Sequence, residues 1–434
     1  MALSDITFRQ FTELMKRKGV KALYMKYLAE NDNSKNQVYL GHDFSSVQIL
    51  PNAGVFPDKN NFKAKVDFYW LKDDEQITPA PNAQLILYPD YPEVRFSGFL
   101  KGSQNSPSDL MNGRITGRVM FFGVCEDGKI IGYVTTENTA LIKEITSMDN
   151  LGSIGVFTNL PIDFGINPKT VLLTELRRIH RLGWIDSKRL TSNGFMECTG
   201  TNCGGLTLEA ELGVISNSKS EPDFMGYEVK QYKVRSFERV YSGSAITLMT
   251  PEPQGGIYKT KGVEEFIRKY GYPDRTIKDR LNFSGIHHVN ERHPKTGLTL
   301  ILDGYDIEKN KINNVNGAII LIDDDDNIAA SWLFNDIIAH WSRKHNHAVY
   351  VPSNKQDEPS LRYSYGHIVL LAEKTDPLFL LKAFANRKVY YDPGIHLDNM
   401  SSNPTAKRRS QFRTQPKNLE ILYENMVQEN LLVN

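Results

Sequence analysis

The spacing of hydrophobic positions changes along the chain, and the change divides the sequence into a β-rich first part and a mixed second part. Phe8, Phe11 and Leu14 recur at helical spacing, and they predict a first helix over residues 7–30. Over residues 38–145, short apolar runs such as VQIL, VDFYWL, LILYP and RVMFFGV are separated by Gly, Pro, Asn and Asp. Such spacing is typical of a small β-rich domain, and it predicts a barrel.

A second set of patterns begins after a segment rich in Gly, Asn and Pro, which we interpret as a linker over residues 151–168. The linker separates a domain at residues 1–150 from a domain at residues 169–434. Pro168 marks the start of a helix, because proline is favoured in the first helical turn and an apolar face follows it. The sequence predicts further helices over 206–213, 331–344 and 418–430, and strands over 224–234, 317–325 and 367–373.

Length and composition match an ordinary globular protein with more than one domain. The 434 residues exceed a single compact domain, since a domain averages about 150 residues. Lys and Arg (52) nearly balance Asp and Glu (51), so net charge neither supports nor excludes a nucleic-acid partner. No apolar run approaches the roughly 18 residues of a membrane helix, and the N-terminus lacks the pattern of a secretion signal. We therefore expect a soluble, cytoplasmic protein without a membrane partner.

Two short motifs resemble metal sites but have simpler interpretations. Cys125, Cys198 and Cys203 are too few for a disulfide framework in a chain of this size. Cys198 and Cys203 are separated by four residues, which hints at a metal-binding pair. Structural zinc needs four ligands, however, and no second Cys/His cluster has suitable spacing. The acidic run at residues 323–326 follows an apolar strand, and we interpret it as a solvated turn.

The segment EPDFMGYEVKQYK carries the strongest chemical signal. Residues two apart on a strand point to the same face, so Glu228 and Lys230 project together. Asp223 lies in the preceding turn, from which it can fold back, and Glu209 lies on the predicted helix before it. Carboxylate oxygens suit Mg²⁺, which binds through one or two carboxylates and keeps several waters. A bound Mg²⁺ would polarise a phosphate and generate hydroxide, while a nearby lysine stabilises the developing charge.

The same residues also have a simpler interpretation, because the pattern D-x4-E-x-K occurs by chance and Glu228 with Lys230 can form an exposed pair. Two features favour a functional site. Tyr227 and Val229 flank Glu228, so the opposite face of the strand is apolar and suits a core. The segment also follows a Gly-rich loop and the helix that carries Glu209. From these residues alone, the two interpretations stay open.

The stretch from Gly183 to Lys230 resembles the MvaI/BcnI family of restriction endonucleases, which share the nuclease fold of the mismatch-repair enzyme MutH. The matching motifs are GWIDSKRL, TGTNCGGLTLEAELG and PDFMGYEVK, and weaker matches continue to AKRRSQFRTQPKNLEILYE. The resemblance implies an α+β protein whose second domain is a PD-(D/E)XK α/β nuclease with a mixed central sheet. It makes Asp223 and Glu228 the Mg²⁺ ligands. Lys230 becomes the catalytic lysine, and Glu209 an accessory acid.

The basic segment AKRRSQFRT matches the family's DNA-recognition region. Arginine pairs with guanine through two hydrogen bonds and glutamine pairs with adenine, although the same side chains can also contact phosphates. The sequence departs from the family here, because a relative has a His-Asp-His-type stretch where KRRS stands, while the following Phe-Arg is kept. Family targets are CC-W-GG or CC-S-GG, and the departure puts that target in doubt. We expect DNA contacts from His396, Lys407, Arg408, Arg409, Gln411 and Arg413.

The first domain resembles the effector domain of EcoRII-type restriction enzymes, a β-pseudobarrel that grips DNA between two arms. The matching motifs are YMKYLAENDNSKNQVYL, EVRFSGFLKGSQNSP and RVMFFGVCEDG. On the residues alone these are ordinary polar loops, whose side chains can also donate to phosphates or base edges. The resemblance assigns DNA contacts to Asn31, Asn33, Lys35, Asn36, Gln37, Arg95 and Lys101.

Together the resemblances imply a type II restriction endonuclease of the IIE kind. It would act as a monomer on double-stranded DNA with Mg²⁺ as cofactor, and its first domain would bind a second DNA copy as effector. Three alternatives stay open: a repair nickase of the MutH kind, a nuclease that senses modified bases, and a catalytically inactive DNA-binding regulator. The intact Asp, Glu and Lys at the family's spacing argue against the last of these.

Overall fold

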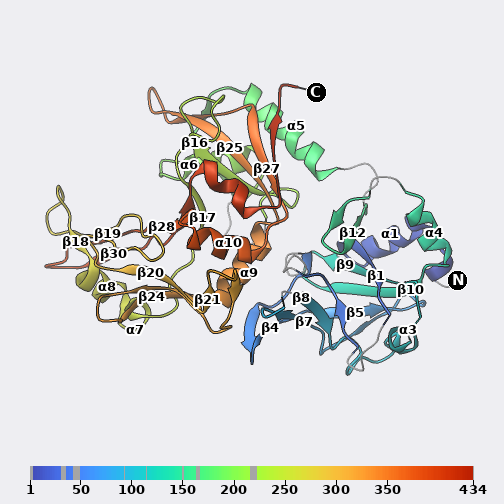
Figure 1. The fold of residues 1–434 in the computed structure, drawn as a ribbon. Coiled ribbons are helices and arrows are strands. Elements are labelled where there is room, and N and C mark those ends of the chain that lie inside the picture. The colour runs from blue at the N-terminus through green and yellow to red at the C-terminus, as the bar shows by residue number, and fades with distance from the viewer. Residues whose placement is uncertain are drawn as a thin grey trace. The chain divides into compact units, whose positions relative to one another are not determined.

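The computed structural model describes residues 3–30, 36–42, 49–91, 93–113, 115–148, 151–162, 167–215 and 222–433 (Figure 1). The chain divides into two compact units, Met1–Ile166 and Asn167–Asn434. Within the described ranges, no helix combines the length and the apolar character needed to span a bilayer.

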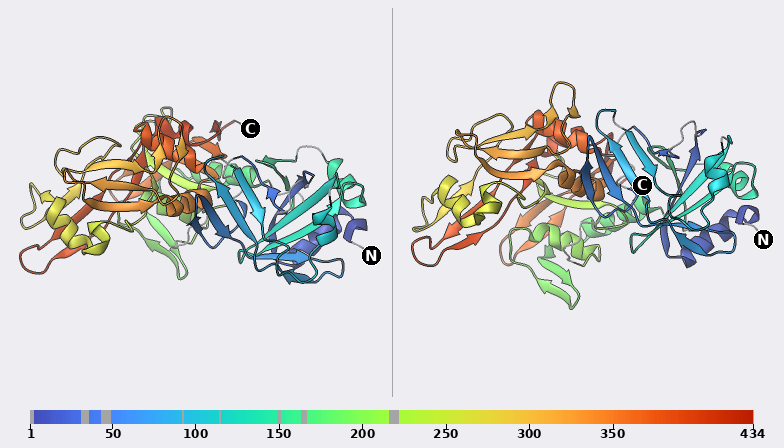
Figure 2. Two further views of the ribbon diagram at one scale, coloured as in Figure 1. Left: turned by 60° about the horizontal axis from the view of Figure 1, so that its bottom comes forward. Right: turned by 90° about the horizontal axis from the view of Figure 1, so that it is seen from below.

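The first unit consists of two β-sheets, with helices against the larger one (Figure 2). The seven-stranded sheet contains, in spatial order, β11 (Ser153–Ile154), β12 (Phe157–Leu160), β1 (Val20–Leu28), β9 (Arg118–Cys125), β10 (Ile130–Thr136), β5 (Phe68–Leu71) and β6 (Ile77–Pro79). The five-stranded sheet contains β2 (Val38–Tyr39), β8 (Glu93–Ser97), β7 (Gln84–Tyr88), β4 (Asn61–Lys65) and β3 (Val55–Asp58). The helices are η1 (Leu3–Asp5), α1 (Phe8–Arg17), α3 (Ser108–Asn112) and α4 (Ala140–Thr146).

Aromatic side chains fill the space between the two sheets of the first unit. The ring centroids of Phe68 and Phe96 lie 5.0 Å apart, and those of Phe96 and Phe122 lie 5.8 Å apart. Neighbouring residues of a strand point to opposite faces, so Phe121 faces the other way and meets Phe11 of α1 at 4.8 Å. The larger sheet is therefore packed on both faces, by the smaller sheet and by the helices.

The first unit is an open pseudobarrel. Its two sheets share no strand and no hydrogen-bonded strand pair among the described residues, so the predicted barrel is not closed. The segment expected as a linker, residues 151–168, contains β11 and β12. Since β12 pairs with both β11 and β1, these two strands of the segment belong to the sheet of the first unit.

The helix predicted over residues 7–30 ends early, and the second half of that prediction is wrong. Thr7 caps α1 by accepting a hydrogen bond from the backbone of Gln10, and Gly19, with φ of +90°, turns the chain out of the helix. The following residues form β1, which pairs antiparallel with β9 along its whole length. Pairing with a neighbouring strand decided the structure here, where the local apolar pattern alone favoured a helix.

The second unit is built on a mixed six-stranded sheet, as the family resemblance implies. Its strands are, in spatial order, β13 (Ile185–Asp186), β26 (Arg362–Tyr365), β25 (His347–Gln356), β27 (Ile368–Glu373) and β32 (Asn425–Asn430), with β16 (Glu228–Lys233) paired in parallel to β25. Helices α5 (Pro168–Arg181) and α6 (Cys203–Glu211) pack on this sheet, where Leu176 and Leu208 join Val229 and Val349 in one core. Helix α9 (Phe334–Lys344) leads into β25, and α10 (Pro377–Ala385) follows β27.

Two long segments outside the central sheet form further small sheets (Figure 1). The first contains β17 (Ile246–Met249), α7 (Ile257–Thr260), α8 (Gly262–Tyr270), β18 (Tyr272–Pro273), β19 (Leu281–Ser284), β20 (Thr299–Asp303), β21 (Tyr305–Asp306), β22 (Lys311–Ile312), β23 (Ala318–Ile322) and β24 (Ile328–Leu333). The second contains β28 (Val389–Tyr391), β29 (Gly394–Asp398), β30 (Thr405–Lys407), β31 (Phe412–Thr414) and the 3₁₀ helix η2 (Pro416–Leu422). The sheets β17-β31-β28 and β18-β19-β29-β30 each combine strands of both segments. A separate hairpin, β14 (Lys188–Thr191) and β15 (Gly194–Glu197), precedes α6.

Most elements predicted for the second unit are confirmed. Asn167 caps α5 and Pro168 occupies its first turn. Residues 331–344 form α9 only from Phe334 onward, because the preceding residues belong to β24. The acidic turn after β23 is held by Asp323, which accepts hydrogen bonds from Lys269, Tyr270 and Asn327.

The last predicted helix, residues 418–430, is wrong. The chain forms η2 and then β32, which pairs with β27 from Asn425 opposite Glu373 to Asn430 opposite Ile368. The strand forms one edge of the central sheet. Pairing with β27 decided the conformation here, although the local spacing of apolar residues favoured a helix.

Candidate active site

Strand β16 places Glu228 and Lys230 at the end of the central sheet where β25 begins. Glu228 lies directly opposite Ala348 in the parallel register of the two strands. Tyr227 and Val229 are buried in the core formed with α5 and α6, so the other face of the strand is apolar as expected. Glu228 is fully buried, and the exposed-pair interpretation of the motif is thereby excluded.

Asp223 folds back onto the start of β16, as the sequence suggested. The turn between them is tight, because Met225 and Gly226 both have positive φ and Phe224 bridges Tyr227. One carboxylate oxygen of Asp223 accepts a hydrogen bond of 2.9 Å from the backbone amide of Val229. Burial and the charge of Glu228 raise the pKa of Asp223 above its usual range.

The two carboxylate oxygens of Glu228 have different surroundings. Oε1 accepts from Lys230 Nζ at 2.5 Å and from Lys344 Nζ at 3.3 Å. Oε2 is buried and has no hydrogen-bond partner among the residues that the structure describes. Burial acts to raise the pKa of this carboxyl, but Lys230 and Lys344 help to outweigh burial and hold it at about 2.

Glu209 on α6 belongs to the same charge cluster. Burial, together with the charge of Asp223, raises the pKa of Glu209 to about 7. Lys230 is affected by all three carboxylates: burial acts to lower its pKa, but Glu228 above all outweighs burial and raises it. The residues that sequence analysis grouped by spacing therefore interact electrostatically in the structure.

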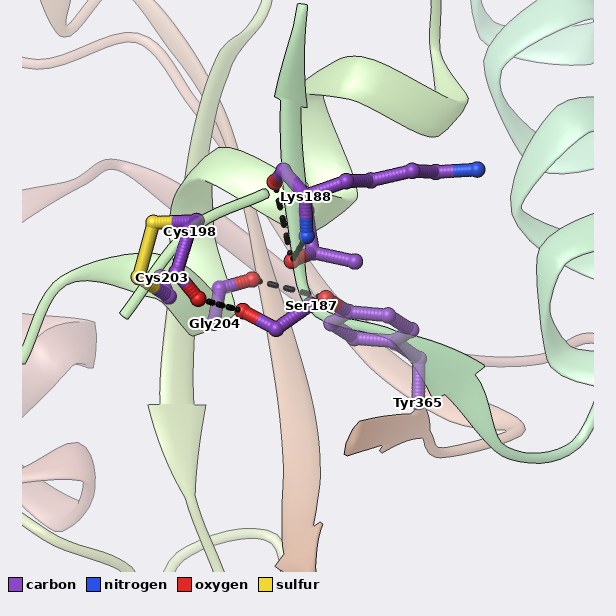
Figure 3. The surroundings of a disulfide bond; sticks show 7 residues. Ser187, Lys188, Cys198, Cys203, Gly204 and Tyr365 are labelled. Carbon is purple, nitrogen blue, oxygen red and sulfur yellow. Dashed lines mark hydrogen bonds between the residues drawn. A yellow bond between two sulfur atoms is a disulfide. The ribbon is translucent and has the colours of Figure 1, made fainter. Parts of the chain in front are cut away.

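A disulfide bond between Cys198 and Cys203 fixes the start of α6 (Figure 3). The cysteine pair therefore does not provide two metal ligands, while Cys125 in the first unit is free and buried. Hydrogen bonds reinforce the attachment, from Ser187 Oγ to the Cys198 carbonyl at 2.6 Å and from the Tyr365 hydroxyl to the Gly204 carbonyl at 2.7 Å (Figure 3). The helix that carries Glu209 is held in place at its N-terminal end.

The arrangement of carboxylates fits Mg²⁺ better than a metal that needs a closed protein cage. No group of three or more His, Cys, Asp and Glu side chains is ready to ligate a metal among the described residues. Mg²⁺ needs only one or two carboxylates, with waters and a substrate phosphate as its other ligands. A buried carboxylate oxygen without a partner is costly unless something binds it, and Glu228 Oε2 is such an oxygen among the described residues.

Helix α9 also contributes to this cluster, and the sequence did not predict this contribution. Its last turn brings Lys344 onto Glu228, and His340 lies one turn earlier on the same helix. Burial, with the charge of Lys344, lowers the pKa of His340 to about 4, so its ring is neutral at pH 7. The spacing of His340 and Lys344, four residues apart on a predicted helix, was the only signal in the sequence.

The basic segment expected to contact DNA is divided between two small sheets. His396 on β29 lies opposite Lys407 on β30, and Arg408 and Arg409 follow as exposed residues. Gln411 is buried and accepts a hydrogen bond of 3.3 Å from Thr247 Oγ1. The structure thus groups His396 with the three basic residues and directs Gln411 inward.

Arg413 lies on β31 and is held by protein groups. Its Nη1 contacts Asp392 at 2.6 Å and its Nη2 donates to the Ala245 carbonyl at 2.7 Å. A guanidinium in this position shapes the sheet β17-β31-β28, and a contact with a base would require it to exchange these partners.

In the first unit, the structure brings the two predicted DNA-contacting segments together. Asn36 and Lys101 line a pocket of ≈ 570 Å³. Gln37 and Arg95 are joined by a hydrogen bond of 3.3 Å from Arg95 Nη1. Asn31, Asn33 and Lys35 lie outside the described residues.

Comparisons with known proteins agree with the resemblance to restriction endonucleases. Residues 173–423 match the model of the MvaI/BcnI restriction endonuclease family. The chain is similar to MvaI in complex with cognate DNA (16% identity, 60% of this chain and 97% of that chain, TM-score 0.45) and to MvaI without DNA (16%, 62% and 99%, 0.34). It is also similar to the B3 domain of the UbaLAI restriction endonuclease with cognate DNA (18% identity, 35% of this chain and 96% of that chain, TM-score 0.23). A comparison with curated protein sequences gave no match.

Proposed function

Because the chain belongs to the MvaI/BcnI restriction endonuclease family, we propose that it is a magnesium-dependent, type II endonuclease that cuts double-stranded DNA at a specific site. The catalytic centre consists of Asp223, Glu228, Lys230 and Glu209. The observation that carries this proposal is Oε2 of Glu228, which is buried and has no hydrogen-bond partner among the described residues, in a carboxylate whose charge also acts on Asp223.

Asp223 and Glu228 would hold Mg²⁺, which supplies a Lewis acid for the phosphate and lowers the pKa of bound water. Lys230 reaches the same site from β16 and stabilises charge that develops on the phosphate. Glu209 has a pKa of about 7, so near neutral pH it can take up a proton from the attacking water. The products are a 5′-phosphate and a 3′-hydroxyl.

DNA recognition belongs to the exposed basic residues beyond the central sheet. Lys407, Arg408 and Arg409, with His396 beside them, form a positive surface suited to phosphates and guanine edges. The target is a short site related to CC-W-GG. In the first unit, Asn36, Gln37, Arg95 and Lys101 bind a second DNA copy, which makes the enzyme IIE-like. The enzyme acts as a monomer.

Cleavage of a plasmid tests this proposal. Unmethylated plasmid of known sequence is incubated with Mg²⁺ and the wild-type protein or the Lys230→Ala variant, and the ends are sequenced. Discrete fragments with 5′-phosphates from the wild type alone support the proposal, and the ends give the site. Nicking that depends on methylation or on a partner protein favours a MutH-like repair enzyme instead. Absence of cleavage on unmethylated and methylated DNA carrying many sites contradicts an autonomous endonuclease.

A further inference from the structure

We propose that Lys344, at the end of α9, is a second catalytic lysine that contacts the scissile phosphate. The inference rests on the proposed function, since it concerns the same cleavage step. Lys344 Nζ lies 3.3 Å from Glu228 Oε1, the same oxygen that Lys230 Nζ contacts at 2.5 Å. Two cationic groups from different parts of the chain therefore meet at one carboxylate oxygen.

The topology of the sheet explains how Lys344 reaches the site. Strands β16 and β25 run parallel, with Glu228 opposite Ala348, so both strands begin at the same end of the sheet. Helix α9 ends at Lys344 just before β25 begins, and its last turn therefore lies at this end of the sheet. His345, the next residue, is fully buried; its Nε2 donates to the Leu248 carbonyl and its Nδ1 is hydrogen-bonded to the Tyr423 hydroxyl, which anchors this corner. The position of Lys344 follows from rigid elements and does not depend on a loop.

Glu228 does not need Lys344 as its nearest counter-charge. Lys230 already provides the buried carboxylate with a counter-charge at shorter range. Asp223 and Glu209 add further negative charge to the cluster, and the unpartnered Oε2 shows that Glu228 is not saturated by its lysines. When a cation binds the carboxylates, the lysines lose part of their attraction to Glu228. The next anion within reach is the phosphate that shares the cation.

In the cleavage step, the water oxygen forms a bond to phosphorus and the bond from phosphorus to the 3′-oxygen breaks. One proton leaves the attacking water and one proton is taken up by the departing 3′-oxygen, so the reaction consumes one water. Negative charge increases on the phosphate oxygens and on the leaving oxygen as this happens. An ammonium group placed there stabilises the transition state more than the ground state, which is the condition for a rate effect.

The test compares Lys344→Met, which keeps much of the aliphatic length, with Lys344→Arg and with Arg343→Ala. Arg343 is the matched control, because it is a cation on the same turn of α9 and is exposed. Rate constants are measured in single turnover on a duplex carrying the site identified by plasmid cleavage. DNA affinity is measured separately with Ca²⁺ in place of Mg²⁺. Thermal melting establishes that each variant is folded, and Lys344→Gln replaces the Met variant if that variant unfolds.

We expect the neutral variant to lower the cleavage rate constant about 100-fold or more, while its DNA affinity changes about threefold at most. Lys344→Arg should recover much of the rate, and Arg343→Ala should cleave like the wild type. A folded neutral variant that cleaves within about threefold of the wild type, while Lys230→Ala is inactive, would overturn the inference and leave the proposed function intact. Failure of the wild type itself to cleave would instead count against the proposed function.

Discussion

Arg118 in the first unit and Glu228 in the second are both buried charges, but the protein satisfies them to different degrees. Arg118 is 1% exposed, and its guanidinium donates to four backbone carbonyls. Nε and Nη1 bind the segment from Leu110 to Ile115, and Nη2 binds Ala29 at 2.7 Å. Ala29 and the acceptors from Leu110 to Ile115 lie far apart in sequence, so Arg118 ties two distant segments of the first unit together.

Glu228 shows the opposite arrangement. One of its oxygens is contacted by the tips of two long lysine side chains, and the other has no partner in the described part of the chain. Folding a chain around a half-satisfied carboxylate costs stability, because burial without a hydrogen bond removes the interaction with water. Such a cost is expected at a site reserved for a ligand, whereas a charge with permanent backbone partners supports the fold. Under the proposed function, Glu228 is a buried charge kept for a ligand, whereas Arg118 supports the fold.

The largest expected effect comes from removing the functional charge. Glu228→Gln keeps the shape of the side chain but weakens its binding to a cation, so the cleavage rate constant should fall by about 10³-fold or more. Single-turnover cleavage measures this loss, and Glu424→Gln at an exposed position serves as the control. Cleavage by the Glu228 variant at the wild-type rate would show that this carboxylate is not part of the catalytic centre.

The structural charge should matter for stability. Arg118→Ala leaves four backbone carbonyls, one of them in a buried and three in a part-buried hydrogen bond, without their donor, and we expect the first unit to lose about 3 kcal/mol of unfolding free energy. Denaturant unfolding gives this value, and hydrogen exchange should report weaker protection around Ala29 and Leu110 but not in β16 or β25. Arg118→Lys should recover only part of the loss, because one ammonium cannot reach all four acceptors. A loss below about 0.5 kcal/mol would contradict a structural role.

Glu209 offers a pH test of the carboxylate cluster. Its pKa of about 7 in the folded state exceeds the value of about 4.3 in an unfolded chain, so the folded state binds the proton more tightly. Its contribution to stability is present below pH 4.3 and is lost as pH rises through 7. Without metal, the unfolding free energy of Glu209→Gln minus that of the wild type should increase by about 1–3 kcal/mol as the pH rises from 5 to 8. Urea unfolding at both pH values in EDTA measures the gap, and an equal gap at both would refute this interpretation.

The smallest effect is expected for an exposed pair. Arg9 and Glu13 of α1 lie 3.2 Å apart with side chains 78% and 52% exposed. Arg9→Ala should therefore change the unfolding free energy by about 0.5 kcal/mol or less, because water screens both charges. Urea unfolding in the same series as Arg118→Ala provides the measurement. A loss comparable to that of Arg118→Ala would mean that burial is not what distinguishes these charges.

The sequence predicted the parts of the fold that depend on local pattern. Helix α5 has a capping Asn167 and Pro168 in its first turn, and these signals are local. The centre at Asp223, Glu228 and Lys230 was visible because a strand places alternate residues on one face and the turn before it is short. Strands β1 and β32 were predicted as helices, because partners that are distant in sequence decide their conformation.

The same distinction explains what was missed at the site. Lys344 is far from Lys230 in sequence, and only the parallel pairing of β16 and β25 brings the two lysines to one oxygen. The inward direction of Gln411 and the partners of Arg413 likewise depend on the sheet β17-β31-β28, whose strands come from separate segments. Non-local strand pairing gave no signal in a single sequence.

Binding of Mn²⁺ as a stand-in for Mg²⁺ tests most directly whether the buried carboxylate of Glu228 is a metal ligand. Affinity is measured by electron paramagnetic resonance for the wild type, Glu228→Gln and Arg118→Lys, each with a duplex that carries the cleavage site. We expect Glu228→Gln to bind Mn²⁺ at least about tenfold more weakly than the wild type, and Arg118→Lys to bind it like the wild type. Equal affinity in the wild type and Glu228→Gln would contradict the account, because the unpartnered oxygen would then not be a metal ligand.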